Sequence, residues 1–92
     1  MDVLTPAPGA EVRPGSLIRW AAVPGRLHYS IQVLSRTGDV LWTERLEDNE
    51  WALRDTPPFE RGGDYWFRVE AMLADGRTLK SEHTSFRIPE PE

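Results

Sequence analysis

Apolar and polar residues alternate with a period of two along most of the chain. The clearest alternating runs are 17–20, 29–34, 65–71 and 83–88, with shorter ones at 40–46 and 51–53. In the second run Tyr29, Ile31 and Val33 share one side, and polar Ser30 and Gln32 share the other. An antiparallel sheet with one buried face produces this alternation, so the pattern predicts a set of short strands.

Turn-forming residues separate these runs at short intervals. They are Pro8-Gly9, Pro14-Gly15, Pro24-Gly25, Gly38-Asp39, Asp48-Asn49, Gly62-Gly63 and Asp75-Gly76. The intervals suit strands better than helices. A helix over 41–53 is the main alternative, but this segment has no N-cap followed by a sustained apolar stripe, and Asp48-Asn49 interrupts it. The chain is therefore predicted to be an all-β sandwich of two sheets.

The composition supports one small domain with a hydrophobic core. The chain has 92 residues, of which 39% are hydrophobic, and it contains 4 Trp. Residues 1–88 are predicted to form the domain, and the Pro/Glu tail 89–92 is typical of a linker within a longer protein. The absence of cysteine excludes disulfides, thiolate catalysis and cysteine-based zinc sites.

The charge and hydropathy of the chain limit the classes of partner that it can bind. The net charge of -4, with 11 scattered basic residues, argues against nucleic acid as a partner. No segment is long and apolar enough to insert directly into a membrane. The first residues show neither a basic region nor an apolar stretch, so any export signal or anchor is expected outside this sequence.

Several segments resemble fibronectin type III domains. The run 59–71 is similar to the family's corner and following strand, with Tyr65 in the place of the corner tyrosine and Phe59 as its apolar anchor. Trp20 matches a tryptophan of an early strand, and 29–33 matches the next strand. The resemblance spans Pro6 to Ile88 and implies a seven-stranded antiparallel Ig-like sandwich. It also implies that the Tyr65 hydroxyl bonds to backbone a few residues upstream.

The order of the motifs is similar to that of a bacterial subgroup. The motifs are Pro8-Gly9-Ala10, the run 20–25, the strand 65–71 and Asp75-Gly76-Arg77. Such domains resemble the extracytoplasmic segments of membrane-anchored bacterial proteins. The resemblance therefore implies an extracytoplasmic location, although the absence of cysteine also suits the cytoplasm.

Catalytic and metal-binding chemistry have little support in the sequence. His28 and His83 lie outside any nucleophile or metal motif. In the predicted sandwich a further strand separates them, by about 10 Å, which is too far for joint binding of one metal. The acidic residues between 44 and 50 lack the spacing and glycine of a calcium loop. We therefore predict no enzyme activity, no metal and no cofactor.

An outward-facing tryptophan is the main functional signal. If Tyr65 and Phe67 face the core, Trp66 faces solvent in mid-sheet, whereas the other three Trp residues belong to the core. The candidate binding residues on this outer face are Trp66, Arg68, Leu34, Gln32 and Leu41. Such a patch suits a protein partner, including flanking domains of the same chain, or a glycan. Alternatively, arginine stems cover the indole and nothing binds. The sequence thus predicts a non-catalytic spacer or protein-interaction module, with a carbohydrate-binding module as the alternative.

Overall fold

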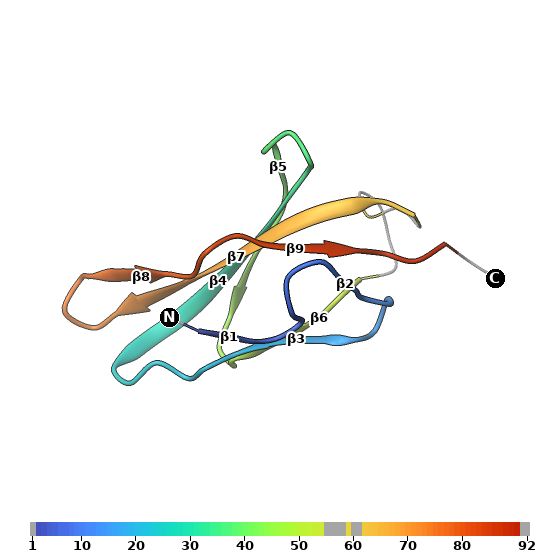
Figure 1. Cartoon of the computed structure of the whole chain (residues 1–92). Coiled ribbons are helices and arrows are strands. Elements are labelled where there is room, and N and C mark those ends of the chain that lie inside the picture. The colour runs from blue at the N-terminus through green and yellow to red at the C-terminus, as the bar shows by residue number, and fades with distance from the viewer. Residues whose placement is uncertain (1, 55–58, 60–61, 91–92) are drawn as a thin grey trace.

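The protein is a sandwich of two β-sheets. A computed structural model describes residues 2–54, 59 and 62–90 (Figure 1). The strands are β1 (Val3–Thr5), β2 (Ala10–Glu11), β3 (Leu17–Trp20), β4 (Arg26–Leu34), β5 (Val40–Leu46), β6 (Glu50–Ala52), β7 (Asp64–Leu73), β8 (Thr78–Lys80) and β9 (Thr84–Arg87). The small sheet has the order β1-β3-β6. The large sheet has the order β2-β9-β7-β4-β5, and β8 also pairs with β7. No helix that could cross a membrane occurs within the described ranges.

The prediction of an all-β two-sheet sandwich is confirmed, but the strand count is not. The described residues form nine strands in a 3 + 6 arrangement instead of seven. The strands that the sequence did not reveal, β1, β2 and β8, have two or three residues each. Strands this short show no alternation, and β8 is exposed throughout. β2 also pairs in parallel with β9, an exception in an otherwise antiparallel fold.

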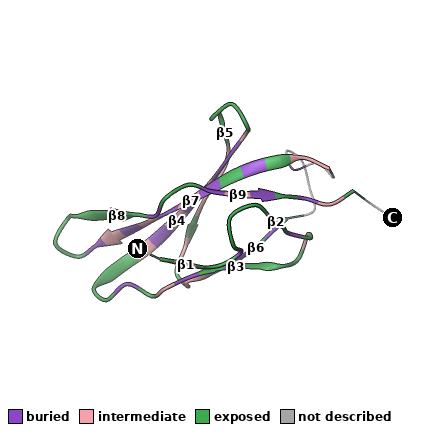
Figure 2. Cartoon of the chain, viewed as in Figure 1, coloured by how far each residue is buried: buried purple, intermediate pink, exposed green. Residues whose placement is uncertain are grey.

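The core is built from the inward-facing residues of the alternating runs. Along β7, buried and less buried positions alternate strictly (Figure 2). Trp20 and Trp51 are buried, and Trp42 is half-buried against the core. Trp66 is 40% exposed. The predicted division into three core-associated tryptophans and one outward tryptophan is therefore confirmed.

Aromatic rings close one end of the sandwich. Phe59 is buried and contacts the rings of Trp42, Trp51 and Tyr65 at centroid distances of 5.7, 6.1 and 5.9 Å. Tyr65 is buried as its predicted corner role requires. The positions just upstream to which its hydroxyl was predicted to bond include 60–61, outside the described residues.

A second buried tyrosine ties a loop to the sheet. The hydroxyl of Tyr29 in β4 accepts a hydrogen bond of 2.9 Å from the backbone N–H of Val23. Both residues are buried. This bond fixes the turn between β3 and β4, because it gives a buried backbone donor its partner.

Candidate functional site

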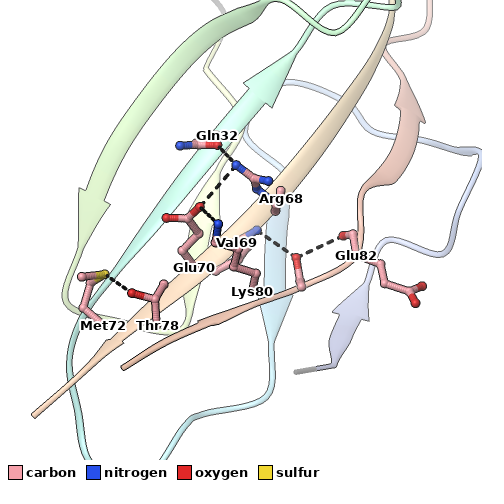
Figure 3. Close-up of polar contacts among 9 residues, drawn as sticks. Gln32, Arg68, Val69, Glu70, Met72, Thr78, Lys80 and Glu82 are labelled. Carbon is pink, nitrogen blue, oxygen red and sulfur yellow. Dashed lines mark hydrogen bonds and ion pairs between the residues drawn. The ribbon is translucent and has the colours of Figure 1, made fainter. Parts of the chain in front are cut away.

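The outer face of the large sheet carries a chain of polar contacts. Arg68 donates a hydrogen bond of 2.6 Å to Gln32 and lies 3.3 Å from Glu70, which lies 3.9 Å from Lys80 (Figure 3). Arg68 and Gln32 were predicted to take part in binding. The guanidinium thus has two partners on this face, although its Nε is buried without one, and the binding role of both residues stays a prediction.

Trp66 lies beside an apolar neighbour at one end of the same face. Leu34 in β4 is directly opposite Trp66 in β7, and Leu34 is buried. The structure thus brings four of the five predicted site residues onto one face, as the neighbouring pairs Leu34–Trp66 and Gln32–Arg68. Leu41 was predicted to share this face, and that placement is wrong, because Leu41 packs against the core. A register shift between Val33 and Leu34 interrupts the pairing of β4 with β5, so counting alternate residues fails there.

Two shallow hollows flank Trp66. One has a volume of about 410 Å³ and lies against the β4–β5 turn; its lining includes Leu34, Arg36 and His83. The other, of about 530 Å³, lies over β9; its lining includes Arg36, Asp64 and Arg87. Trp66 and Arg36 line both, so the indole stands between two concave surfaces that share one arginine.

A histidine and a methionine meet at the other end of the large sheet. His28 in β4 lies directly opposite Met72 in β7, and both side chains are half-buried. The register shifts between Arg26 and His28, a bulge of the kind that redirects side chains. The Thr78 hydroxyl donates a hydrogen bond of 3.3 Å to the Met72 sulfur (Figure 3). The His–Met pair therefore combines an imidazole and a thioether on one outer face.

The described residues contain no group of three or more His, Cys, Asp or Glu side chains placed to hold a metal. His28 lies on β4, and His83 precedes β9. β7 runs between these two strands, so the predicted separation of the histidines is confirmed. Among the acidic residues, Glu50 pairs with Arg19 at 3.1 Å and Glu44 pairs with Arg54 at 2.9 Å. Two of the carboxylates between 44 and 50 thus have cationic partners.

Glu44 has a lowered pKa. Burial alone would raise it, but hydrogen bonds from the side chains of Arg54 and Trp42, with the charge of Arg54, outweigh burial. The Trp42 indole N–H donates to this carboxylate at 3.2 Å, and the Arg54 guanidinium also lies over the Trp42 ring, 5.7 Å from its centroid. The contacts among Glu44, Trp42 and Arg54 thus join β5 to the segment after β6.

This lowered pKa predicts an acid-sensitive contribution to stability. The contribution is fully present above the unfolded-state pKa of Glu44, near its ordinary value of 4.5, and is lost as the pH falls through the lower folded-state pKa. Wild type and Glu44→Gln should be compared by urea unfolding at about pH 7 and about pH 3. The stability difference between the two proteins should shrink at the lower pH. A difference that does not change with pH would contradict this role for the carboxylate.

Comparison with known proteins finds a likeness in fold to one solved structure. No family model matches the chain, and no curated protein matches it significantly. A solved structure that matches over the full length is that of CopC from Methylosinus trichosporium OB3b. The TM-score is 0.64 and the sequence identity 19%, and the match covers 100% of this chain and 93% of that one. The chain is therefore a CopC-like β-sandwich in fold.

This likeness corrects the sequence-based predictions of function. The full-length likeness to CopC contradicts the predicted spacer or protein-interaction module and also the carbohydrate-binding alternative. The fibronectin type III resemblance is confirmed only as far as a two-sheet β-sandwich.

Sequence reasoning missed both the His–Met pair and Arg36. The pair depends on the register between β4 and β7 at the far end of long strands, where β4 begins at Arg26 rather than at the predicted residue 29. Extending the alternation of the two strands to their ends could have found it. Arg36 lies on a turn, where no periodicity indicates the direction of a side chain.

Proposed function

We propose that this domain handles copper outside the cytoplasm and binds the monovalent ion through His28 and Met72. The observation that carries the proposal is the direct cross-strand placement of an imidazole and a thioether on one sheet face. Opposite residues of antiparallel strands have Cβ atoms about 4.5–5.5 Å apart, so both side chains can reach one ion. The full-length fold likeness to CopC supports copper as the cargo and a bacterial periplasmic setting.

The donor set fits one oxidation state of copper better than the other. Thioethers favour soft Cu⁺, and imidazole suits copper in general. Divalent copper prefers four nitrogen or oxygen donors in a plane, and the described part of the chain contains no cluster of three His, Cys, Asp or Glu. A His–Met pair therefore suits monovalent copper and does not suit divalent copper.

The surroundings of the pair suit an ion that enters and leaves. Both ligand side chains are half-buried, so the ion has direct access from solvent. Thr78 positions the sulfur through its hydroxyl, and sulfur retains a lone pair for the metal. With two protein ligands the site should bind more weakly than a closed three- or four-ligand site. Weak binding suits transfer of the ion to another carrier.

Methyl resonances of methionine give a direct test of copper binding. The chain has only two methionines, so isotope labelling of their methyl groups yields two signals, one from Met72. Ag⁺, a stable stand-in for Cu⁺, and then Cu⁺ under anaerobic conditions should be titrated into the folded protein. The Met72 signal should shift and saturate. His28→Asn should weaken binding at least about tenfold, as even the loss of an outer-shell partner can.

A matched histidine controls for non-specific binding. His83→Asn removes the other histidine of the chain and should leave the titration unchanged. Met72→Leu removes the methionine methyl probe, so binding to this variant is followed through the His28 imidazole resonances. These resonances should not respond to Ag⁺ in Met72→Leu. Equal weakening by His28→Asn and His83→Asn, or no Met72 shift at millimolar Ag⁺, would refute the proposal.

The proposal also covers the type of sandwich and the kind of protein to which the domain belongs. The small sheet β1-β3-β6 and the path β9-β7-β4-β5 agree with the strand order that the fibronectin type III resemblance implies. We therefore propose an Ig-like sandwich of that type that belongs to a membrane-anchored bacterial protein. Expression of the full-length gene product followed by cell fractionation would test the anchorage.

A further inference from the structure

The hollows around Trp66 gather cations that have no partner. Arg36 lines both hollows, is exposed, and makes no ion pair or hydrogen bond within the described ranges. Arg87, which lines the second hollow, is likewise exposed and unpaired there. By contrast, four other arginines lie within 4.0 Å of a carboxylate: Arg19, Arg54, Arg68 and Arg77. Among the described arginines without such a carboxylate, Arg36 and Arg87 are the two that line the hollows beside Trp66.

The acidic and titratable groups near the hollows leave this charge largely uncompensated. Asp64 lines the second hollow and lies directly opposite Arg87 across β7 and β9. The first hollow contains no carboxylate; its other titratable group is His83. Asp64 therefore offsets Arg87 in part. Asp39 on the β4–β5 turn lies near the first hollow but does not line it, and its carboxylate accepts a hydrogen bond of 3.1 Å from Thr37.

The remaining lining is apolar and planar. The Trp66 indole offers an exposed ring face, and buried Leu34 lies directly opposite it. An aromatic ring can stack on an indole, and a guanidinium holds a carboxylate through two parallel hydrogen bonds. The hollow of about 410 Å³ lies in the size range of sites for small organic ligands.

We propose that the hollow between Trp66 and the β4–β5 turn binds a small aromatic carboxylate, with the ring on Trp66 and the carboxylate on Arg36. This site is separate from the His28–Met72 pair, and it retains Trp66 and Leu34 of the sequence-predicted patch. It replaces Arg68, whose guanidinium already bonds to Gln32 and pairs with Glu70.

The test uses naphthoate as the probe and the indole N–H signals of the folded, metal-free protein as the readout. The chain has four tryptophans, and Trp66→Phe identifies the signal of Trp66. Naphthoate should shift that signal with saturation. Arg36→Gln should weaken binding about tenfold, the usual effect of losing a charged hydrogen-bond partner. Trp66→Ala should weaken it by a similar factor, because the stacking surface is lost.

Controls separate this site from general charge and from copper handling. Arg13→Gln removes an exposed arginine that lines neither hollow and should leave naphthoate binding unchanged. Naphthalene methanol keeps the ring without the charge and should bind at least about tenfold more weakly. His28→Asn should retain naphthoate binding, so failure of the copper proposal would not affect this one. Equal binding of the acid and the alcohol, or equal effects of Arg13→Gln and Arg36→Gln, would overturn the proposal.

Discussion

Trp20→Ala is expected to lower the free energy of unfolding by about 3–5 kcal/mol, the usual loss for a large aromatic residue in a core. The Trp20 side chain is 0% exposed and packs edge-on against Tyr29 at a centroid distance of 5.4 Å. The loss combines the transfer of buried apolar surface with the cavity that remains. Urea unfolding followed by far-UV circular dichroism measures it, and an unchanged m-value would show that the unfolded state is comparable.

Trp66→Ala is the matched control, because it removes the same side chain from the outer face. Trp66 is 40% exposed and lies outside the core cluster. Its replacement should change the free energy of unfolding by no more than about 0.5 kcal/mol, as surface substitutions usually do. Similar losses for the two variants would mean that the outer face is covered in solution and that the facing of β7 has been misassigned.

Tyr29→Phe is expected to lower the free energy of unfolding by about 1–3 kcal/mol, the cost of leaving a buried polar group without a partner. The substitution keeps the ring but removes the oxygen that accepts the Val23 N–H at 2.9 Å. Val23 is 9% exposed, so water does not readily replace the lost partner. Equilibrium unfolding gives the loss, and amide hydrogen exchange should show faster exchange at Val23.

Thr43→Val is the control for removal of a hydroxyl in the same sheet. Thr43 lies on β5 and is exposed. Its loss should change stability by no more than about 0.5 kcal/mol, because water already solvates that hydroxyl. If Tyr29→Phe proved as mild as Thr43→Val, the turn between β3 and β4 would have an alternative partner for the Val23 amide.

The sequence predicted the fold wherever long strands bury one face. The period of two placed Tyr29, Ile31 and Val33 in the core, and it turned Trp66 outward. This works because a strand has no freedom to place neighbouring side chains on the same face. Composition then required that most large apolar residues enter the core of so short a chain.

Features that depend on register, bulges or turns could not be predicted in this way. Leu41 was assigned to the wrong face because the pairing shifts between Val33 and Leu34. His28 meets Met72 only because β4 and β7 continue past the predicted run to their paired ends. Both candidate sites therefore include residues whose positions follow from strand pairing or turn geometry rather than from local alternation.

The function was harder to predict from the sequence than the fold. The resemblance to fibronectin type III domains suggested a spacer or interaction module, whereas the structure matches CopC over its whole length. Two-sheet sandwiches host many functions, so a correct fold class does not determine the ligand. Both proposed sites depend on single side chains, Met72 in one and Arg36 in the other.

The parallel pairing of β2 with β9 has a mechanical consequence. Gly9 donates a backbone hydrogen bond to Ser85 and Val12 donates one to Arg87, at 2.9 and 2.8 Å. The two strands run in the same direction, one leading from the N-terminal side and the other toward the C-terminal side. A pull on β2 toward the N-terminus and on β9 toward the C-terminus therefore slides the strands past each other in shear, and it loads these bonds together rather than one at a time. Because β1 pairs with β3, a pull on the N-terminus reaches this shear pairing only through β1.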